Sequence, residues 1–407
     1  MTGLVAGISL QKAGQDVVIV STGQSALHFN SGSLSLIASD DTAGTISALP
    51  PCHPYAKIGT DSILSTAARV AEFFHAAGID LEGEAGRLHY RLSPTGEWRK
   101  AWLTLKGFAT ADDPSNLDWG KTTVVNIYGF LDFYPAFICR TLTLGGLHAQ
   151  ERVIKLPAFE RLRKSHTEMR ATNIARIAHG EIINQLADEL NRIADETEAQ
   201  TLVMPAVIGL NDTGDAPRLM SLVKVPLKFI NTIPISVGGL YMQMRLASYF
   251  RRLGGTLLPG DMVTEGHLQG NKIVDIVTQN LGDDHIVADN YILASGSFIS
   301  HGLKASPTAI TEPIFGFDVD ALDDREQWTS ASIYDDQPYM SFGVATDSMF
   351  HTLKDGVAVS NCHAAGSILS GANPLREGSG AGIAILTALY VAAHIVKKSQ
   401  QQNAMQP

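Results

Sequence analysis

The sequence contains little cysteine, and its few thiols are widely separated. Cys52, Cys139 and Cys362 are the three cysteines of the 407 residues, and no C-x-x-C pair occurs. An iron–sulfur cluster or a zinc ribbon needs clustered thiolates, so neither is supported and we expect no metal site. Isolated thiols of this kind are typical of a reducing, cytoplasmic compartment.

Long apolar runs and an excess of positive charge are also missing. The longest apolar stretch, residues 381–396, is interrupted by Thr387, Tyr390 and His394. It is shorter than the roughly 18 residues that suggest a membrane-spanning helix. Any membrane contact is therefore expected to go through a partner. The net charge of −10 argues against nucleic acid as a general partner but leaves room for a small anion in a local basic pocket.

The beginning of the sequence lacks most of a dinucleotide-binding fingerprint. That fingerprint is a strand followed by G-x-G-x-x-G, and only its last glycine is present, as Gly3. The apolar spacing over residues 4–10 predicts a helix that ends near Gly14, and residues 16–21 predict a buried parallel strand. We expect the missing strand and glycines to lie upstream of Met1, so that the native chain begins earlier.

The sequence nevertheless contains both ends of a flavin-binding α/β domain. A second glycine-rich segment at 361–382 leads into an apolar helix expected at 383–396, and an apolar strand at 288–294 is followed by Ser-Gly. We predict an α/β protein with a Rossmann-like flavin-binding domain, its first strand missing in this chain, and an inserted α+β cap or substrate domain. The flavin-binding domain is expected at 1–40, 236–300 and 356–398, the inserted domain at 41–235 and 301–355, and a flexible tail at 399–407.

Glycine and serine gather where backbone turns would meet a nucleotide. Glycine lets the backbone approach a ribityl chain or a phosphate, and the N-terminus of the C-terminal helix would present free N–H groups to a reduced flavin. The residues expected to bind the cofactor are Gly3, Ser21, Thr22, Gly23, Ser25, Ser31, Gly32, Ser33, Val263, Ser295, Gly296, Gly366, Ser367, Gly378, Gly380, Ala381 and Gly382. The alternatives are a surface Ser/Gly loop at 22–33 and a glycine-rich helix-packing motif at 378–382.

The most basic stretch of the expected inserted domain is residues 161–176. Its cations are Arg161, Arg163, Lys164, Arg170 and Arg176. Guanidinium groups make bidentate hydrogen bonds to an oxyanion, as binding of a phosphate ester would require. The alternative is the solvated face of a helix.

A longer set of motifs resembles one family over nearly the whole chain. The run G-Q-S-A-L-H-F-N-S-G-S-L at 23–34 is much more specific than a single glycine motif. The other matching segments are Leu156-Pro157, Glu168, Arg170, Asn173-Ile174-Ala175-Arg176, Met204-Pro205-Ala206, Pro259-Gly260-Asp261, residues 293–298, Glu312-Pro313-Ile314, and Gly366-Ser367 with the glycines after it. Together they resemble the B subunit of anaerobic glycerol-3-phosphate dehydrogenase.

This resemblance implies a flavoprotein subunit of a quinone-dependent respiratory enzyme. Such an enzyme oxidises sn-glycerol 3-phosphate to dihydroxyacetone phosphate and passes electrons to quinone in fumarate or nitrate respiration. Its other parts are a second flavin subunit, together with an iron–sulfur, membrane-anchoring subunit, which would hold this chain on the inner face of the cell membrane. The resemblance implies FMN, and Ser21 or Thr22 stands where FAD sites carry an acidic residue for the ribose. The dinucleotide-type fold keeps FAD as the alternative.

The resemblance also suggests roles for three side chains. Arg170 and Arg176 are expected to hold an anion, and His28 is expected near the flavin as a catalytic residue. A structural hydrogen-bonding role is the alternative for His28, and this chain could instead relay electrons from the flavin of its partner. Two further functions stay open: another flavin oxidoreductase of the fumarate reductase or 2-hydroxy-acid type, and a non-catalytic scaffold.

Overall fold

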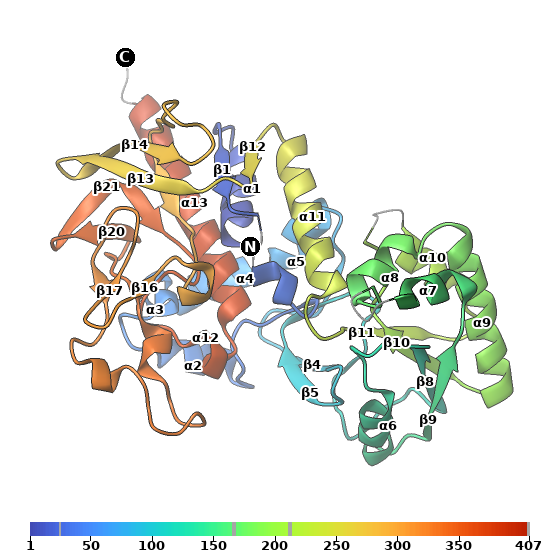
Figure 1. Cartoon of the computed structure of the whole chain (residues 1–407). Coiled ribbons are helices and arrows are strands. Elements are labelled where there is room, and N and C mark those ends of the chain that lie inside the picture. Colours follow the sequence, from blue (N-terminus) through green and yellow to red (C-terminus); the bar gives the residue numbers. More distant parts are fainter. Residues whose placement is uncertain (24–25, 165–167, 211–213, 405–407) are drawn as a thin grey trace. The chain divides into compact units, whose positions relative to one another are not determined.

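The computed structural model describes residues 1–23, 26–164, 168–210 and 214–404 (Figure 1). The chain divides into two compact units, each of which is described separately. Unit 1 comprises residues 1–26, 35–73 and 246–407, and unit 2 comprises residues 27–34 and 74–245.

Unit 1 begins with a helix and a parallel strand pair. Helix α1 (Thr2–Lys12) leads into β1 (Val18–Ser21), which pairs in parallel with β12 (Thr256–Pro259). The predicted helix and strand are therefore present. The strand is less buried than predicted, since Val18 is 44% exposed. The reason is that β1 has a single described neighbour, β12, in its sheet.

A second sheet of unit 1 carries the C-terminal half of the fold. Its order is β15 (Tyr291–Leu293), β21 (Val357–Ala364), β20 (His351–Lys354), with β15 and β21 parallel and β20 antiparallel to β21. Apolar residues of β15 and β21 share one core with Leu10 of α1 and Val391 and Ile395 of the last helix. That helix, α13 (Gly380–Ala404), packs along α1 (Figure 1).

Helix α13 is longer than the sequence indicated. It continues to Ala404 through most of the segment expected as a flexible tail. Over Gly380–Gln401 its length and composition alone would suffice to cross a membrane, which corrects the expectation of a short interrupted run. Half of its most apolar stretch is buried in the protein, and the core helix of a globular domain has the same properties.

Unit 1 also contains residues that were expected in the inserted domain. Residues 41–73 form α2 (Thr42–Ser47), α3 (Pro54–Ile58), α4 (Thr60–Ala67) and the start of α5 (Val70–Ala76), and residues 301–355 form β16 (Lys304–Ala305), β17 (Ile310–Thr311), β18 (Val319–Asp320), β19 (Gly343–Val344) and β20. The hairpin β13 (Val263–Gln269) and β14 (Lys272–Thr278) and the short helix α12 (Pro374–Glu377) complete this unit. Both segments join unit 1 because α3 packs against α13 and because the Val344 N–H donates to the Ile368 carbonyl at 2.8 Å.

Unit 2 is built around a four-stranded parallel sheet. The strands are β8 (Thr122–Ile127), β9 (Ala149–Ile154), β10 (Thr201–Pro205) and β11 (Leu227–Ile230), in the order β11-β10-β8-β9. The connections contain α6 (Pro135–Leu144), α7 (Pro157–Glu160), α8 (Ala171–Ile177), α9 (Glu181–Thr197) and α10 (Asp215–Leu222). In chain order this sheet reads 2-1-3-4, a doubly wound arrangement that the sequence did not indicate for the inserted part.

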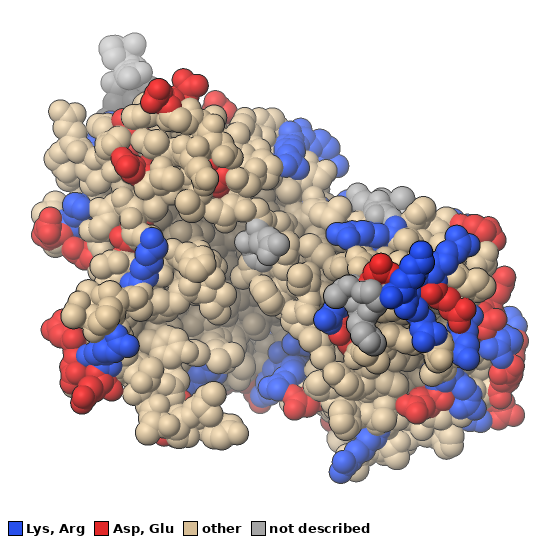
Figure 2. All heavy atoms as spheres, in the orientation of Figure 1, with Lys and Arg blue, Asp and Glu red and all other residues tan. Residues whose placement is uncertain are grey.

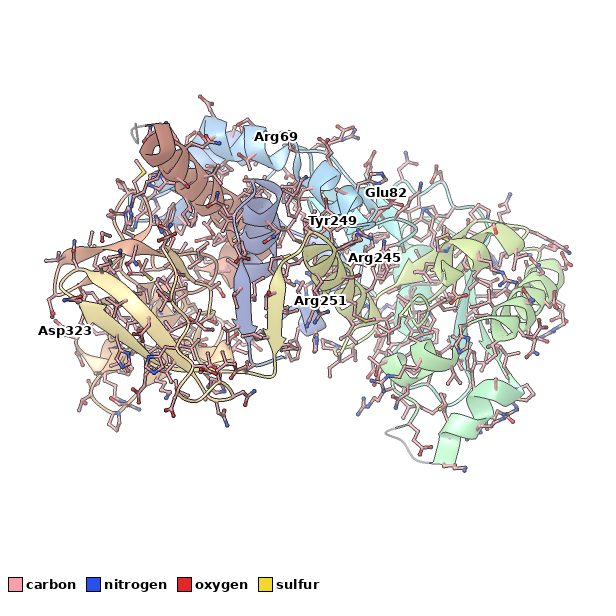
Figure 3. The ribbon with its side chains drawn as sticks, turned by 90° about the horizontal axis from the view of Figure 1, so that it is seen from above. Arg69, Glu82, Arg245, Tyr249, Arg251 and Asp323 are labelled. Atoms are coloured by element: carbon pink, nitrogen blue, oxygen red, sulfur yellow. The ribbon has the colours of Figure 1, made fainter. Side chains whose placement is uncertain are left out.

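Two small antiparallel sheets complete unit 2. They are β2 (Ser33–Leu34), β6 (Leu103–Leu105) and β3 (Leu81–Glu82), and β5 (Trp98–Ala101), β4 (His89–Leu92) and β7 (Thr110–Ala111). Helix α11 (Val237–Arg252) starts in unit 2 and ends in unit 1, and Arg245, Tyr249 and Arg251 lie along it (Figure 3). The start of α11 holds the 27–34 loop, as described below.

Candidate functional site

The carboxyl ends of β15 and β21 meet the N-terminus of α1 in unit 1. Strand β15 runs parallel to β21 with Leu293 opposite Ala364, and the Ala365 N–H donates to the Leu293 carbonyl at 3.0 Å. Gly3 in the first turn of α1 faces Ala294, directly after β15. Three segments that are far apart in the sequence therefore converge at one strand edge, where α/β folds bind ligands.

Gly366 fixes how closely these segments approach. It has φ +80°, and a Cβ at this position would lie 2.2 Å from the Thr2 hydroxyl oxygen. Its N–H donates to the Thr387 hydroxyl at 2.9 Å, and that hydroxyl donates to the Ile383 carbonyl at 2.6 Å. Both the left-handed backbone and the contact with Thr2 require glycine here.

The neighbouring turns bring three more predicted residues to this edge. Gly296 lies against Ser300 and within reach of the Ser367 side chain. Ser295 precedes it, and Ser367 follows Gly366, so Ser295–Gly296 and Gly366–Ser367 form adjacent turns. Of the predicted cofactor residues, Gly3, Ser295, Gly296, Gly366 and Ser367 are thus brought together.

The end of β1 forms a second part of the predicted site. Ser21 is the last residue of β1, its carbonyl accepts from the Asp261 N–H at 3.2 Å, and its hydroxyl accepts from the Gly23 N–H at 3.3 Å. Thr22 lies between them and is exposed, while Val263 opens β13 opposite Thr278. Ser25 lies outside the described residues.

Asp261 adjoins the end of β1, and its carboxylate oxygens already have partners. They accept from the Thr278 hydroxyl at 2.7 Å and from the N–H groups of Met262 and Asn280 at 2.8 and 3.0 Å. Burial alone would raise the pKa of Asp261, but these three hydrogen bonds outweigh it and lower the pKa. The carboxylate is consequently ionised and engaged within the protein.

The C-terminal glycines pack against another part of unit 1. A Cβ on Gly382 would lie 2.1 Å from the Tyr55 hydroxyl, and the Gly382 N–H donates to the Ser35 carbonyl at 2.8 Å. Gly378 lies against Ala38, and Gly380 lies near Pro374, with Ala381 between Gly380 and Gly382. The sequence predicted free N–H groups at this helix N-terminus, but the Gly382 N–H is already bonded to the Ser35 carbonyl and cannot donate to a ligand.

The residue before these glycines, Glu377, is held by a hydrogen bond from the buried His53. The Tyr55 N–H donates to His53 Nδ1 at 3.0 Å, so His53 Nε2 carries the proton and donates to Glu377 at 3.2 Å. The Ser379 hydroxyl and the Asn373 N–H also donate to Glu377, at 2.7 and 2.8 Å. Burial opposes ionisation of Glu377, but the bonds from His53, Asn373 and Ser379 together lower its pKa.

The serine-rich loop after β1 belongs to unit 2. Ser236 fixes it, because its N–H donates to the His28 carbonyl at 2.9 Å and its hydroxyl contacts the Asn30 carbonyl. Ser33 is buried and accepts from the Thr104 hydroxyl at 3.0 Å. Gly32 packs against Phe108, and Ser31 is half-buried. The backbone of this loop is thus held at the start of α11.

The carboxyl edge of the parallel sheet gives unit 2 its own candidate ligand region. The Tyr128 ring, directly after β8, lies 4.2 Å from the Arg163 guanidinium and 4.4 Å from Lys155 Nζ. After β11, Asn231 Oδ1 and Thr232 Oγ1 are buried and have no hydrogen-bond partner among the described residues. Doubly wound sheets bind ligands at this edge, where the strand order reverses between β8 and β10.

The two predicted anion-binding arginines lie at opposite ends of α8. Arg170 precedes the helix, and its Nη1 donates to both carboxylate oxygens of Asp132, at 2.8 and 3.1 Å. Arg176 lies in the last turn and donates to Asn173 at 3.0 Å. Lys and Arg gather on the face of unit 2 over α7 and α8 (Figure 2). The two arginines bond to different residues at opposite ends of α8 and do not converge on one point.

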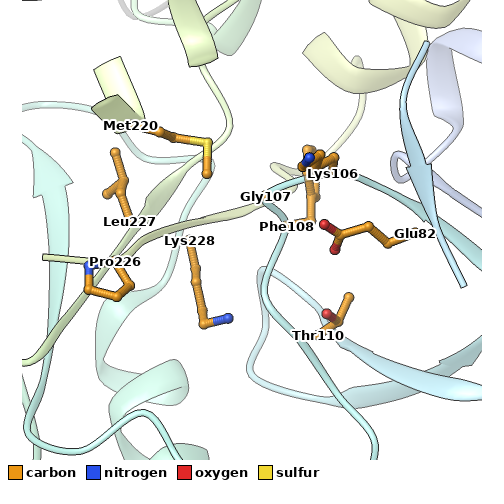
Figure 4. Close-up of a pocket in the computed structure, with 9 residues that line it drawn as sticks. All are labelled: Glu82, Lys106, Gly107, Phe108, Thr110, Met220, Pro226, Leu227 and Lys228. Carbon is orange, nitrogen blue, oxygen red and sulfur yellow. The ribbon is translucent and has the colours of Figure 1, made fainter. Parts of the chain in front are cut away.

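A pocket of about 280 Å³ lies at the other end of the sheet of unit 2 (Figure 4). Its walls include Pro226 and Leu227, where β11 begins, together with Lys228, Phe108 and Met220. Burial lowers the pKa of Lys228, which lies over the Trp119 ring. None of the site residues predicted from the sequence lines this pocket, and it lies away from the ligand-binding edge of a parallel sheet.

Several residues of the site were not predicted from the sequence. Among them, Thr387 had the clearest signal in the sequence, because a threonine inside an apolar helix needs a hydrogen-bond partner. Thr2, His53 and Glu377 act through contacts with distant residues, so no local pattern could identify them.

The converging turns of unit 1 define a flavin-binding α/β domain, and a family of FAD binding domains matches residues 1–383. The B subunit of anaerobic glycerol-3-phosphate dehydrogenase from Yersinia enterocolitica is 38% identical over 97% of this chain and 96% of its own length. The proteins of that name from Pectobacterium carotovorum and Vibrio cholerae are 34% identical over 98% and 97% of this chain and 97% and 94% of theirs. The chain belongs to the family of anaerobic glycerol-3-phosphate dehydrogenase B subunits.

The contact of Gly366 with Thr2 can be tested against a matched glycine. In Gly366→Ala the new methyl group meets Thr2, whereas in Gly356→Ala, at φ +74°, it meets nothing within 4 Å. Both variants incur the left-handed backbone strain of about 1 kcal/mol, and Gly366→Ala incurs about 1–3 kcal/mol more from the overlap. Urea unfolding followed by circular dichroism measures the difference, and equal losses for the two variants would contradict the assigned contact.

The Glu377 network predicts a stability term that depends on pH. A lowered pKa in the folded protein means that the ionised carboxylate contributes fully above its usual value of 4.5, and this contribution disappears as pH falls through the lowered value. Glu377→Gln should therefore cost about 1–2 kcal/mol at pH 7 and progressively less in acid. Exposed Glu326→Gln is the control. Thermal unfolding from pH 7 to pH 3 checks this, and a constant deficit across that range would refute it.

Proposed function

We propose that this chain is the flavoprotein subunit of a respiratory, quinone-dependent glycerol-3-phosphate dehydrogenase. The complex would oxidise sn-glycerol 3-phosphate to dihydroxyacetone phosphate and reduce quinone, in support of anaerobic respiration with fumarate or nitrate. Its partners would be a second flavin subunit, together with an iron–sulfur subunit. The chain would lie on the cytoplasmic face of the membrane, to which the iron–sulfur partner would attach it.

The convergence of backbone turns at the carboxyl ends of β15 and β21 carries this proposal. Gly296 and Gly366 carry no side chain in these turns, and α1 directs its N-terminus towards the same edge. Backbone N–H groups at such an edge suit the phosphate and ribityl chain of a flavin. When bound, the flavin supplies a two-electron acceptor that can release its electrons singly. Similarity to the B-subunit relatives over almost the whole chain supports the same role.

FMN is the proposed form of the cofactor. FAD sites of dinucleotide-binding folds use a carboxylate at the end of the second strand to hold the adenosine ribose. At that place this chain has Ser21 and Thr22, and the adjoining Asp261 carboxylate is occupied by Thr278, Met262 and Asn280. FMN lacks the adenosine and needs no such carboxylate.

Arg170 is proposed to bind the substrate phosphate. Both of its bonds to Asp132 use Nη1, so Nε and Nη2 have no partner among the described residues and can donate to an oxyanion. The Arg170 side chain is 58% exposed, while Asp132 is 14% exposed and acts as its anchor. Arg176 would add to the positive field of the same face. His28, held through its backbone carbonyl, leaves its half-buried ring available to a ligand.

The cofactor is identified by releasing it from the purified complex. Co-purification with the two proposed partners, denaturation and chromatography of the released flavin should give FMN in proportion to this chain, and Gly366→Ala should release less of it than Gly356→Ala. Release of FAD alone would overturn the FMN proposal. If all flavin belonged to the second flavin subunit, this chain would be a scaffold and the flavoprotein proposal would fail.

The role of Arg170 is tested by steady-state kinetics of the same complex. Arg170→Ala should raise KM for glycerol 3-phosphate by roughly ten- to a hundredfold, because a charge-assisted hydrogen bond is worth about 1.5–3 kcal/mol. Arg161→Ala, on the same basic face, is the control and should change KM less than twofold. A drop in kcat with unchanged KM, or equal effects of both variants, would remove Arg170 from phosphate binding.

A further inference from the structure

Three histidines from three different elements meet in unit 1, and none of them is among the residues assigned above. His351 lies on β20 and His363 on β21, where they are directly opposite each other in the antiparallel ladder. His394 comes from α13. The ring centroids are 4.3 Å apart for His351 and His363, and 5.9 and 5.7 Å from these two rings to His394. One possible ligand nitrogen from each ring lies within 4.8 Å of the other two.

From this arrangement we propose that His351, His363 and His394 bind a divalent transition-metal ion, with Zn²⁺ as the expected ion. In a tetrahedral site with Zn–N bonds of about 2.0–2.1 Å, ligand nitrogens lie about 3.3 Å apart. The rings would close on the metal by at most about 1.5 Å. Side-chain rotation can supply such a movement while the two paired strands and the helix stay in place.

The burial of His363 provides an independent observation. Its side chain is fully buried, and neither Nδ1 nor Nε2 has a hydrogen-bond partner among the described residues. An unsatisfied buried polar group destabilises the folded protein, and a metal bond to one nitrogen would remove part of that destabilisation. Because neither nitrogen has such a partner, the ring can offer a lone pair to a metal ion.

Asp347 orients the second ligand from outside the cluster. Its Oδ2 lies 2.9 Å from His351 Nδ1, and its Oδ1 accepts from the N–H groups of Met349 and His351 at 2.9 and 2.8 Å. A carboxylate on Nδ1 leaves Nε2 as the metal ligand and increases its basicity, as in carboxylate–histidine–zinc sites. Asp347 also supplies negative charge near the cluster, which counteracts the positive charge of Lys398. The Lys398 ammonium group donates to the Ser360 carbonyl.

The chemistry of the donors selects the kind of metal. Three neutral imidazoles suit Zn²⁺, Cu²⁺ or Ni²⁺ and do not suit Mg²⁺ or Ca²⁺, which prefer oxygen ligands. Cys362 is adjacent in sequence, but it precedes His363 on β21, and successive side chains of a strand point to opposite faces. The proposed ion would join β20, β21 and the C-terminal half of α13. The sequence predicted no metal site because its cysteines are isolated, whereas the three histidines come together only in the fold.

The site is tested by titrating the chelator-treated full chain with ZnCl₂ in a calorimeter. A second group, His267, Asp275 and His285, lies on the exposed surface and serves as the internal control. We expect one tightly bound Zn²⁺ that persists in His267→Ala/His285→Ala and binds at least a hundredfold more weakly in His394→Ala. Zn²⁺ should also raise the melting temperature of the wild type and of the surface variant, but not that of His394→Ala.

Two further measurements separate loss of a ligand from loss of the fold. Circular dichroism of metal-free His394→Ala should match the wild type, and if it does not, His351→Ala replaces it in the titration. Co²⁺ should give the visible absorption of a tetrahedral nitrogen site in the wild type. No stoichiometric binding by the wild type, or binding that is lost in His267→Ala/His285→Ala, would overturn the proposal.

Discussion

The contact of Thr2 with the backbone at Gly366 is the constraint on which the candidate flavin site depends. It holds the first turn of α1 against the strand edge formed by β15 and β21. Thr387 on α13 secures Gly366 from the other side. The turns at Ser295–Gly296 and Gly366–Ser367 are oriented together because each segment is held by one of the others. A preorganised edge of this kind can bind an anionic group without first paying the entropy of ordering it.

A second set of contacts separates packing from binding in the C-terminal glycine segment. Gly382 lies too close to the Tyr55 hydroxyl to carry a side chain, and its N–H donates to the Ser35 carbonyl. The Glu377 carboxylate accepts hydrogen bonds from His53, Asn373 and Ser379. Together they fix where α13 begins. The glycines at 378–382 therefore support the candidate site through the position of α13, while Gly366 and Gly296 form its edge. The same helix carries His394, so one element positions both the flavin edge and the histidine cluster.

Sequence patterns predicted the parts of this structure that depend on local periodicity. Helix α1, the central part of α13, strands β1 and β15, and the turn at Ser295–Gly296 follow from apolar spacing and glycine placement. The pairing of His53 with Glu377 across 324 positions leaves no local pattern. Neither does the meeting of His351, His363 and His394, which arises only when β20 pairs with β21 and α13 packs nearby. The sequence analysis assigned residues 41–73 and 301–355 to the inserted domain, whereas they belong to unit 1. Their packing against α13 and Ile368 is likewise non-local, so no local pattern indicates it.

The packing of the first helix on the last sets an order of events during protein synthesis. Unit 2 has all of its residues once position 245 has left the ribosome, whereas α1 must wait for α13, which ends at Ala404. At about 5–20 residues per second the whole chain takes on the order of 20–80 s to make. During much of that time α1 lacks α13, against which it packs and with which its Leu10 shares a core. Chaperone demand and aggregation during expression should therefore concentrate at helix α1.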